Sequence, residues 1–436
     1  MNKIFYVIII FLVRANFALP QNSWKGEIKE INGIPTIFNS SQPICITPTI
    51  ALQKVWQIGG EDPGFIMNII TSIDVDENGN IYVTDSSEKN VKVFSDLGEL
   101  LFAFAKEGQG PGEFRSPECI TIIANNLVLV IDPRIAYPMN RFNFFDSNGR
   151  FIDAYNINLR SQSYHKEINF NDQSSLLSQH KIEFSKLFSN NRLLLFSYAT
   201  GNMKLAIKSL WLYDIFKREA SEIITIKKND PRLTNMEKQN DRMFLNIQWC
   251  HNNNGNIYLI EDVYEYNIHV YNSYGNLKKV LRREFNLPIK TKMEYEKALK
   301  KAKEVNTFYK NLGEKVIWEP LKENPIIFNL LTISRSMFCD DKNRLWILTN
   351  ESLSTKKSKE IFSSLFKNKT KRSIDEKPTH FSFDIFSPEG KYLMKIPFDA
   401  NQPRCFIYKK GFIYFADLGE DGFPWLYKYQ ILEIND

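Results

Sequence analysis

The sequence is poor in the features that mark small cross-linked domains and membrane-spanning proteins. Its 436 residues include five cysteines, scattered from Cys45 to Cys405, and no CxxC pair occurs. A zinc ribbon and a thioredoxin-like site are therefore excluded, and we expect the cysteines to be buried core thiols. After residue 13 no apolar run is long enough to span a bilayer.

Charge of one sign is also scarce. The chain has 56 Lys and Arg against 50 Asp and Glu, and its net charge of +6 is too small to indicate a nucleic-acid partner. Aromatic residues, in contrast, are plentiful, with 33 Phe and 19 Tyr. Because aromatic side chains suit the half-buried surface of a sheet, this composition favours a large β-rich core.

The N-terminus is typical of an export signal. Lys3 precedes an apolar run at residues 4–13, and Ala15 or Ala18 is placed for cleavage. We predict a signal peptide over residues 1–18 and a secreted or periplasmic mature chain without a membrane span; an uncleaved anchor is the alternative. No Cys follows the apolar run at once, so a lipid anchor is not expected.

Two kinds of hairpin recur along the chain. In the first, an aromatic residue stands four places before a turn glycine, at 91–101, 142–152, 268–278 and 383–393. Copies of the second are GNIYVTD at 79–85, GNIYLIE at 255–261, NRLWILT at 343–349 and GFIYFAD at 411–417, with weaker copies at 125–132 and 191–198. Together they give six four-stranded units, which start near residues 70, 116, 180, 243, 333 and 403. We therefore predict an all-β fold, a six-bladed β-propeller of four-stranded antiparallel blades.

The segment before the first unit predicts how the ring closes. Residues 51–64 resemble the fourth strand and link at 99–112, while the last unit ends after three strands. We expect residues 51–58 to complete the last blade, because a closed ring leaves no bare sheet edge. The side chains of this strand expected to be partly buried are Leu52, Val55 and Ile58, with Trp56 packed at a blade edge. The predicted domains are an N-terminal extension at 19–48 and the propeller at 49–436.

One link between units carries a family resemblance. GQGPGEFRSP at 108–117 resembles the inter-blade link of NHL-repeat propellers, and residues 49–434 are similar to exported bacterial six-bladed propellers of this kind. That group is largely without assigned activity, so the resemblance implies the fold but no ligand. The link lacks the Lys-Ser/Thr pair and the βαβ context of a phosphate loop, so phosphate binding is not expected.

The segment DVDENGNIYVTD at 74–85 fits the calcium loop of an EF-hand at most ligand positions. Both flanks have strand periodicity, however, and the copy at 250–261 has Cys250 in the first ligand place. We interpret the segment as a tight hairpin without a tight calcium site. His251, His269 and His380 fall at different blade positions, so a catalytic zinc is not expected either. We predict no cofactor and no metal.

Two insertions interrupt the repeats. The insertion at 287–325 has a helical pattern near 292–311, in which Tyr295, Leu299, Ala302 and Val305 form an apolar stripe. The insertion at 352–379 has eight basic and three acidic residues, which gives a net charge of 8 − 3 = +5. It is either a solvated loop or a site for an anionic partner.

The strand order predicts where function resides. Strands of a meander alternate in direction, so the long segments all emerge on one face of the ring, and long loops on a rigid scaffold are where binding usually occurs. The polar residues at strand ends on this face are Asp85, Arg115, Glu118, Asp132, Arg134, Arg141, Glu261 and Arg335. We predict a monomeric binding scaffold for a protein, small-molecule or glycan ligand. A hydrolase or lyase with a calcium or zinc site in the channel is the alternative, and surface ion pairing is the alternative role of each named residue.

Overall fold

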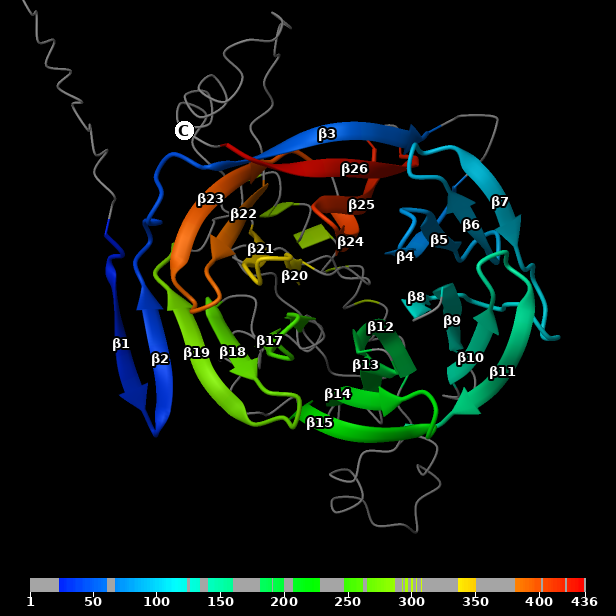
Figure 1. Cartoon of the computed structure of the whole chain (residues 1–436), viewed down its shortest axis with the longest axis horizontal. Coiled ribbons are helices and arrows are strands. Elements are labelled where there is room, and N and C mark those ends of the chain that lie inside the picture. The colour runs from blue at the N-terminus through cyan, green and yellow to red at the C-terminus, as the bar shows by residue number, and fades with distance from the viewer. Residues whose placement is uncertain are drawn as a thin grey trace, which may run out of the picture.

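The computed structural model shows six sheets arranged as blades around a central axis (Figure 1). It describes residues 23–60, 67–123, 126–133, 140–159, 181–189, 191–199, 207–227, 247–261, 265–286, 336–349, 381–400, 403–419 and 422–434, with single helical positions between 292 and 307. Each blade is a four-stranded antiparallel meander whose first strand lies nearest the axis. The predicted six-bladed β-propeller is confirmed.

The blades follow one another along the chain. Blade 1 contains β4 (Ile70–Val75), β5 (Ile81–Asp85), β6 (Asn90–Phe94) and β7 (Leu100–Phe104). Blade 2 contains β8 (Cys119–Ile123), β9 (Leu127–Pro133), β10 (Asn140–Phe145) and β11 (Phe151–Ile157). Blade 3 contains β12 (Lys181–Ser189), β13 (Arg192–Ala199), β14 (Ile207–Asp214) and β15 (Glu219–Lys227).

Blade 4 contains β16 (Gln248–His251), β17 (Ile257–Ile260), β18 (Asn267–Tyr271) and β19 (Leu277–Arg283). Blade 5 contains β20 (Met337–Cys339), β21 (Leu345–Thr349), β22 (Phe381–Phe386) and β23 (Tyr392–Phe398). Blade 6 contains β24 (Pro403–Lys409), β25 (Phe412–Leu418), β26 (Pro424–Glu433) and β3 (Ile50–Gly59).

The core lies between the blades rather than in one centre. Six hydrophobic clusters each join residues of two neighbouring blades. The inner strands are therefore covered on both faces, and β5 (sequence IYVTD) is buried at every position. This burial explains why these strands are apolar almost throughout instead of alternating.

Blade 6 closes the ring as predicted, because β3 pairs antiparallel with β26. Leu52 and Ile58 are partly buried, as expected, but Val55 is 47% exposed, so that prediction was wrong. The pairing register shifts between Lys428 and Tyr429, opposite Val55, and this bulge inserts one extra residue into β3. The bulge reverses the alternation: Leu52 packs between blades 5 and 6, whereas Trp56 packs between blades 6 and 1.

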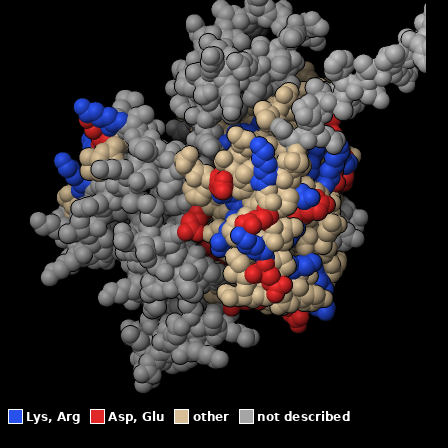
Figure 2. Space-filling model, turned by 90° about the vertical axis from the view of Figure 1, so that its left-hand side faces the viewer, with Lys and Arg blue, Asp and Glu red and all other residues tan. Residues whose placement is uncertain are grey.

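An N-terminal hairpin extends blade 4, within the region predicted only as an extension. Its strands are β1 (Gly26–Ile31) and β2 (Ile34–Asn39), and β2 pairs parallel with β19 to make a six-stranded sheet. Asn39 fastens the hairpin, since its Nδ2 donates to the main-chain oxygens of Arg282 and Gly390 at 3.1 and 3.0 Å. Figure 2 shows basic and acidic side chains interspersed on this side of the molecule.

The ring has two faces with different connections. On the turn face, connections such as 76–80, 252–256 and 340–344 are tight turns. In each the first side chain accepts amide hydrogens two and four residues on, as Asp76 does from Asn78 and Asn80 at 2.9 and 2.8 Å. On the link face lie the connections between second and third strands and the links between blades.

The structure describes only part of the two insertions. The described positions from Lys292 to Thr307 are helical, which agrees with the predicted helix, and Tyr295 is half-buried while Leu299 is exposed. The basic insertion at 352–379 lies outside the described residues. No helix in the described part of the chain is long and apolar enough to cross a membrane.

Candidate functional site

The acids at the ends of second strands hold the link face together. Asp85 is fully buried, and its carboxylate accepts the amide hydrogens of Asn68 and Ile69, at 2.9 and 3.2 Å, and of Glu88 at 3.2 Å. The Lys92 ammonium lies 3.2 Å away. Burial alone would raise the pKa of Asp85, but the Asn68 amide, Lys92 and the other amides outweigh it, and the pKa is lowered.

Asp132 has the same role in blade 2. Its carboxylate accepts the amide hydrogens of Arg115 and Ser116 at 3.1 and 2.7 Å, and it is buried. The side chain of Arg115 is exposed, whereas Glu118 is half-buried. Asp85 and Asp132 therefore each fix the main chain where it enters the inner strand of their own blade, and the exposed Arg115 side chain lies at the second of these places.

Arg141 braces the Gly-rich link between blades 1 and 2. Its Nη1 and Nη2 donate to the main-chain oxygens of Gln109 and Gly110 at 2.9 and 3.0 Å. A second contact stabilises the same link: the Glu113 carboxylate accepts the amide hydrogen of Gly110 at 2.8 Å. Arg141 and Glu113 thus satisfy main-chain polar groups of this connection, in addition to the bridge between Glu107 and Phe114.

Glu261 joins a cluster within blade 4. Its buried carboxylate lies 2.6 Å from Nδ1 of His269 and accepts the Tyr271 hydroxyl at 3.1 Å. Leu259 pairs directly with His269, so Glu261 is a diagonal cross-strand neighbour of the imidazole. The contact between Glu261 and His269 depends on the pairing register of β17 and β18, which cannot be read from the sequence alone. Arg134 and Arg335, the other predicted site residues, lie outside the described residues.

The inner strands bring further charges around the axis. Asp74 of β4 accepts the amide hydrogen of Ile122 in blade 2 at 2.7 Å. Burial raises the pKa of this carboxyl, although that bond and the charges of Lys409 and Lys186 oppose the shift. Lysines of two other inner strands, β24 and β12, thus act electrostatically on the Asp74 carboxyl.

A groove of about 670 Å³ lies where β18 begins and β19 ends in blade 4, between these outer strands and the N-terminal hairpin. Aromatic and charged side chains share its lining, among them Phe38, Tyr266, Phe285, Lys25, Arg282 and Glu265. Arg282 is exposed, and its guanidinium lies 5.6 Å from the centre of the Phe38 ring. A groove of this size, with a few polar groups among aromatic rings, is suited to a small polar ligand.

The wall of the groove rests on a buried charge cluster. Asp384 of blade 5 lies 3.3 Å from Nη1 of Arg283 and accepts the hydroxyls of Tyr266 and Tyr392 at 2.6 and 2.8 Å. Burial alone would raise the pKa of Asp384, but Arg283, then Lys395 and the two hydroxyls, lower it. The cluster spans blades 4 and 5 and holds Tyr266 and Arg283 in place.

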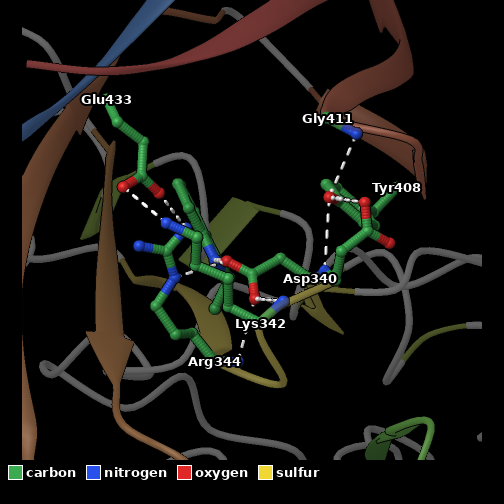
Figure 3. A network of polar contacts seen from close by, with 8 residues as sticks. Asp340, Lys342, Arg344, Tyr408, Gly411 and Glu433 are labelled. Atoms are coloured by element: carbon green, nitrogen blue, oxygen red, sulfur yellow. Dashed lines mark hydrogen bonds and ion pairs between the residues drawn. The ribbon is translucent and has the colours of Figure 1, made fainter.

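The turn face carries a polar network of a different kind (Figure 3). Glu433 of β26 pairs with Lys342 and Arg344 at 2.6 and 2.9 Å, and Arg344 pairs with Asp340 at 2.6 Å. The Tyr408 hydroxyl accepts the amide hydrogen of Gly411 at 3.0 Å. These contacts join a turn of blade 5 to blade 6, so the network serves the closure of the ring.

The calcium-like segment 74–85 is a hairpin, as predicted. Asp74, Asp76 and Asp85 each accept main-chain amides at separate places, so their carboxylates do not converge. Within the described residues, no group of three or more His, Cys, Asp and Glu side chains is arranged to hold a metal ion.

Comparison with known proteins assigns this chain to no family. No protein-family model matches the sequence, and no curated protein matches it at a significant level. Among solved structures, a DUF4221-family protein from Bacteroides vulgatus is 10% identical, over 88% of this chain and 99% of that chain, with a TM-score of 0.46. A virginiamycin B lyase from Staphylococcus aureus is 10% identical over 88% and 100% of the two chains, with a TM-score of 0.40. The calcium-binding protein regucalcin from Agrobacterium tumefaciens is 8% identical over 84% and 91%, with a TM-score of 0.41.

Proposed function

We propose that this protein is an exported binding scaffold of the NHL-like propeller kind, and that its ligand binds on the link face. The ligand class that the described groove fits is a small polar molecule, a glycan or a peptide segment. The proposal assigns no chemical reaction to the chain.

The observation that carries the proposal is the difference between the two faces. The long gaps between consecutive strands, such as Ile157 to Lys181 and Arg283 to Met337, begin and end on the link face. The lining of the described groove includes residues 282–285, where the second of these gaps begins, whereas the connections described on the turn face are short turns that satisfy their own main-chain hydrogen bonds. Variable connections on a rigid scaffold are where propellers and other folds place their binding residues.

The groove has the chemistry for recognition of a polar ligand. Phe38, Tyr266 and Phe285 offer ring faces, and Arg282 and Lys25 offer cationic donors beside them. The acidic residues Glu27, Glu265 and Glu284 lie in the same lining, so the groove is not selective for anions. Hydroxyl-rich ligands, which stack on rings and accept and donate hydrogen bonds, match this mixture.

The test is a thermal-shift screen of the mature chain against a panel of soluble oligosaccharides and short peptides. For each compound with a saturating response, calorimetry then compares the wild type with Arg282→Ala, Arg115→Ala and Arg150→Ala. Arg282 lines the groove, Arg115 is exposed elsewhere on the link face, and Arg150 is an exposed control on the turn face.

We expect Arg282→Ala to weaken binding roughly tenfold, the effect of losing one charged hydrogen bond of about 1.4 kcal/mol. Arg150→Ala should leave the affinity unchanged. Loss of binding in Arg115→Ala alone would move the site to the channel side of the link face. Loss in Arg150→Ala alone would contradict the proposal.

A further inference from the structure

Two cysteines far apart in the sequence meet between blades 4 and 5. Cys250 lies on β16 and Cys339 on β20, the inner strands of these neighbouring blades, and their sulfurs are 3.7 Å apart. Cys405, by comparison, directs its thiol to the main-chain oxygen of Thr71 at 3.2 Å. The contact between Cys250 and Cys339 places two thiols where one bond would join two blades.

We propose that Cys250 and Cys339 form a modification site, at which a small-molecule disulfide such as oxidised glutathione converts the two thiols into an inter-blade disulfide. The geometry supports this, because the sulfurs have only to approach by about 1.7 Å to reach the ~2.05 Å of an S–S bond.

The surroundings keep the sulfurs directed at one another. Cys250 is buried in an apolar cluster with Tyr258, Met337 and Leu345, and Cys339 packs against the same cluster. As a residue, Cys339 is partly buried and Cys250 is buried, so Cys339 is the less enclosed of the two and the one assigned the first attack. Burial, and then the contact with Cys250, raises the pKa of the Cys339 thiol, so the reaction is expected to be slow at neutral pH and faster in alkali.

The reaction proceeds by two exchanges. The Cys339 thiolate attacks one sulfur of oxidised glutathione, the S–S bond breaks, and one glutathione leaves and takes up a proton. The Cys250 thiol then loses its proton and attacks the Cys339 sulfur of the mixed disulfide, which releases the second glutathione. The chain loses two hydrogen atoms, and the oxidant gains them as two thiols.

The disulfide would join blades 4 and 5 covalently and so stabilise the ring. It closes a loop of 89 residues in sequence separation and links two inner strands, so it restricts the unfolded chain strongly. We expect the melting temperature of the oxidised protein to exceed that of the reduced protein by several degrees. The inference concerns stability and does not depend on the ligand-binding proposal.

The experiment uses the full mature chain. Reduced protein is freed of reductant and incubated with oxidised glutathione at pH 8.5; free thiols are then blocked with N-ethylmaleimide, and the protein is digested without reduction for mass spectrometry. The expected result is a linked peptide pair containing Cys250 and Cys339, blocking of two fewer thiols than in the reduced sample, and no lasting glutathione adduct.

Matched variants sharpen the test. Cys339→Ala should abolish the linked peptide and the rise in melting temperature, whereas Cys405→Ala should retain both. The wild-type peptide map decides the question even if a variant fails to fold. The proposal is overturned if the folded wild type yields no linked pair, retains glutathione on Cys339, or links other cysteines instead.

Discussion

The indole Nε1 of Trp56 donates to the main-chain oxygen of Asp96 across 2.9 Å. This bond joins the ring-closing strand β3 to the last turn of blade 1, and the buried Lys428 ammonium of β26 is paired with the Asp96 carboxylate. The first and last parts of the propeller therefore meet at Asp96. Their contact seals the junction between blades 6 and 1.

Replacement of Trp56 tests this seal. We expect Trp56→Ala to lower the free energy of unfolding by about 3 kcal/mol, because it removes a half-buried ring and a hydrogen bond. Trp56→Phe, which loses the bond but retains most of the ring, should cost about 1 kcal/mol. Urea unfolding measures both, with the exposed Phe216→Ala as the control. An unchanged midpoint in Trp56→Ala would show that β3 does not secure the closure.

The Asp384 cluster gives a second prediction. Asp384→Ala leaves the fully buried Arg283 without its carboxylate and should cost about 3–5 kcal/mol. The double variant Asp384→Leu with Arg283→Met removes both charges and should lose less than the sum of its two single variants, Asp384→Leu and Arg283→Met, which a double-mutant cycle measures. Additive losses of the two single variants would contradict a coupled pair.

The same cluster predicts a pH dependence. The pKa of Asp384 is lower in the folded protein than its unfolded value of about 3.9. Its contribution is therefore fully present above about pH 5 and is lost as the pH falls below 4 through the folded pKa. The wild type should lose stability more steeply than the double variant between pH 5 and 3. Parallel profiles in acid would argue against this assignment.

Asp85 provides a test of the link-face anchors. Asp85→Ala leaves the amides of Asn68, Ile69 and Glu88 without their acceptor and Lys92 without its counter-ion, and should lower the free energy of unfolding by about 2–4 kcal/mol. Glu99→Ala, at an exposed position on the turn side of the same blade, should change it by less than about 0.5 kcal/mol. Hydrogen exchange should rise at residues 67–69 in Asp85→Ala. Retained protection there would show that other contacts hold the link.

The hairpin at 74–85 predicts a negative result with calcium. Asp76 is occupied by the amides of Asn78 and Asn80, so calorimetric titration should show no micromolar calcium site. Asp76→Ala should destabilise the fold by about 1–2 kcal/mol without a change in calcium response. A micromolar site that disappears in Asp76→Ala would overturn the structural interpretation.

Much of the fold could be predicted because each blade repeats a local signal. Turn residues such as Asp76 and Gly79 define their hairpins without help from the rest of the chain. The last unit has only three strands of its own, so residues 51–58 were expected to supply its fourth strand. The N-terminal hairpin also has a local signal, since Asn32 and Gly33 take positive φ in its turn. The pairing of this hairpin with β19 has no local signal in the sequence, because it depends on the outer edge of blade 4, which exists only once that blade has formed.

The site was less predictable, because strand-end position does not reveal what a side chain contacts. Asp85 and Asp132 accept main-chain amides, and these contacts depend on where the links between blades return to the ring. The bulge at Val55 and the meeting of Cys250 with Cys339 are likewise products of register and blade packing. The groove forms only because the N-terminal hairpin pairs with blade 4, and this pairing was not predicted from the sequence.

The most direct test of the binding scaffold is a hydrogen-exchange footprint of the mature protein, with and without an oligosaccharide or peptide that gives a saturating thermal shift. The account predicts protection at residues 38–40 and 265–267 or at the link 105–118, and unchanged exchange in the turns 95–99 and 272–276. Protection confined to those turns would contradict the account.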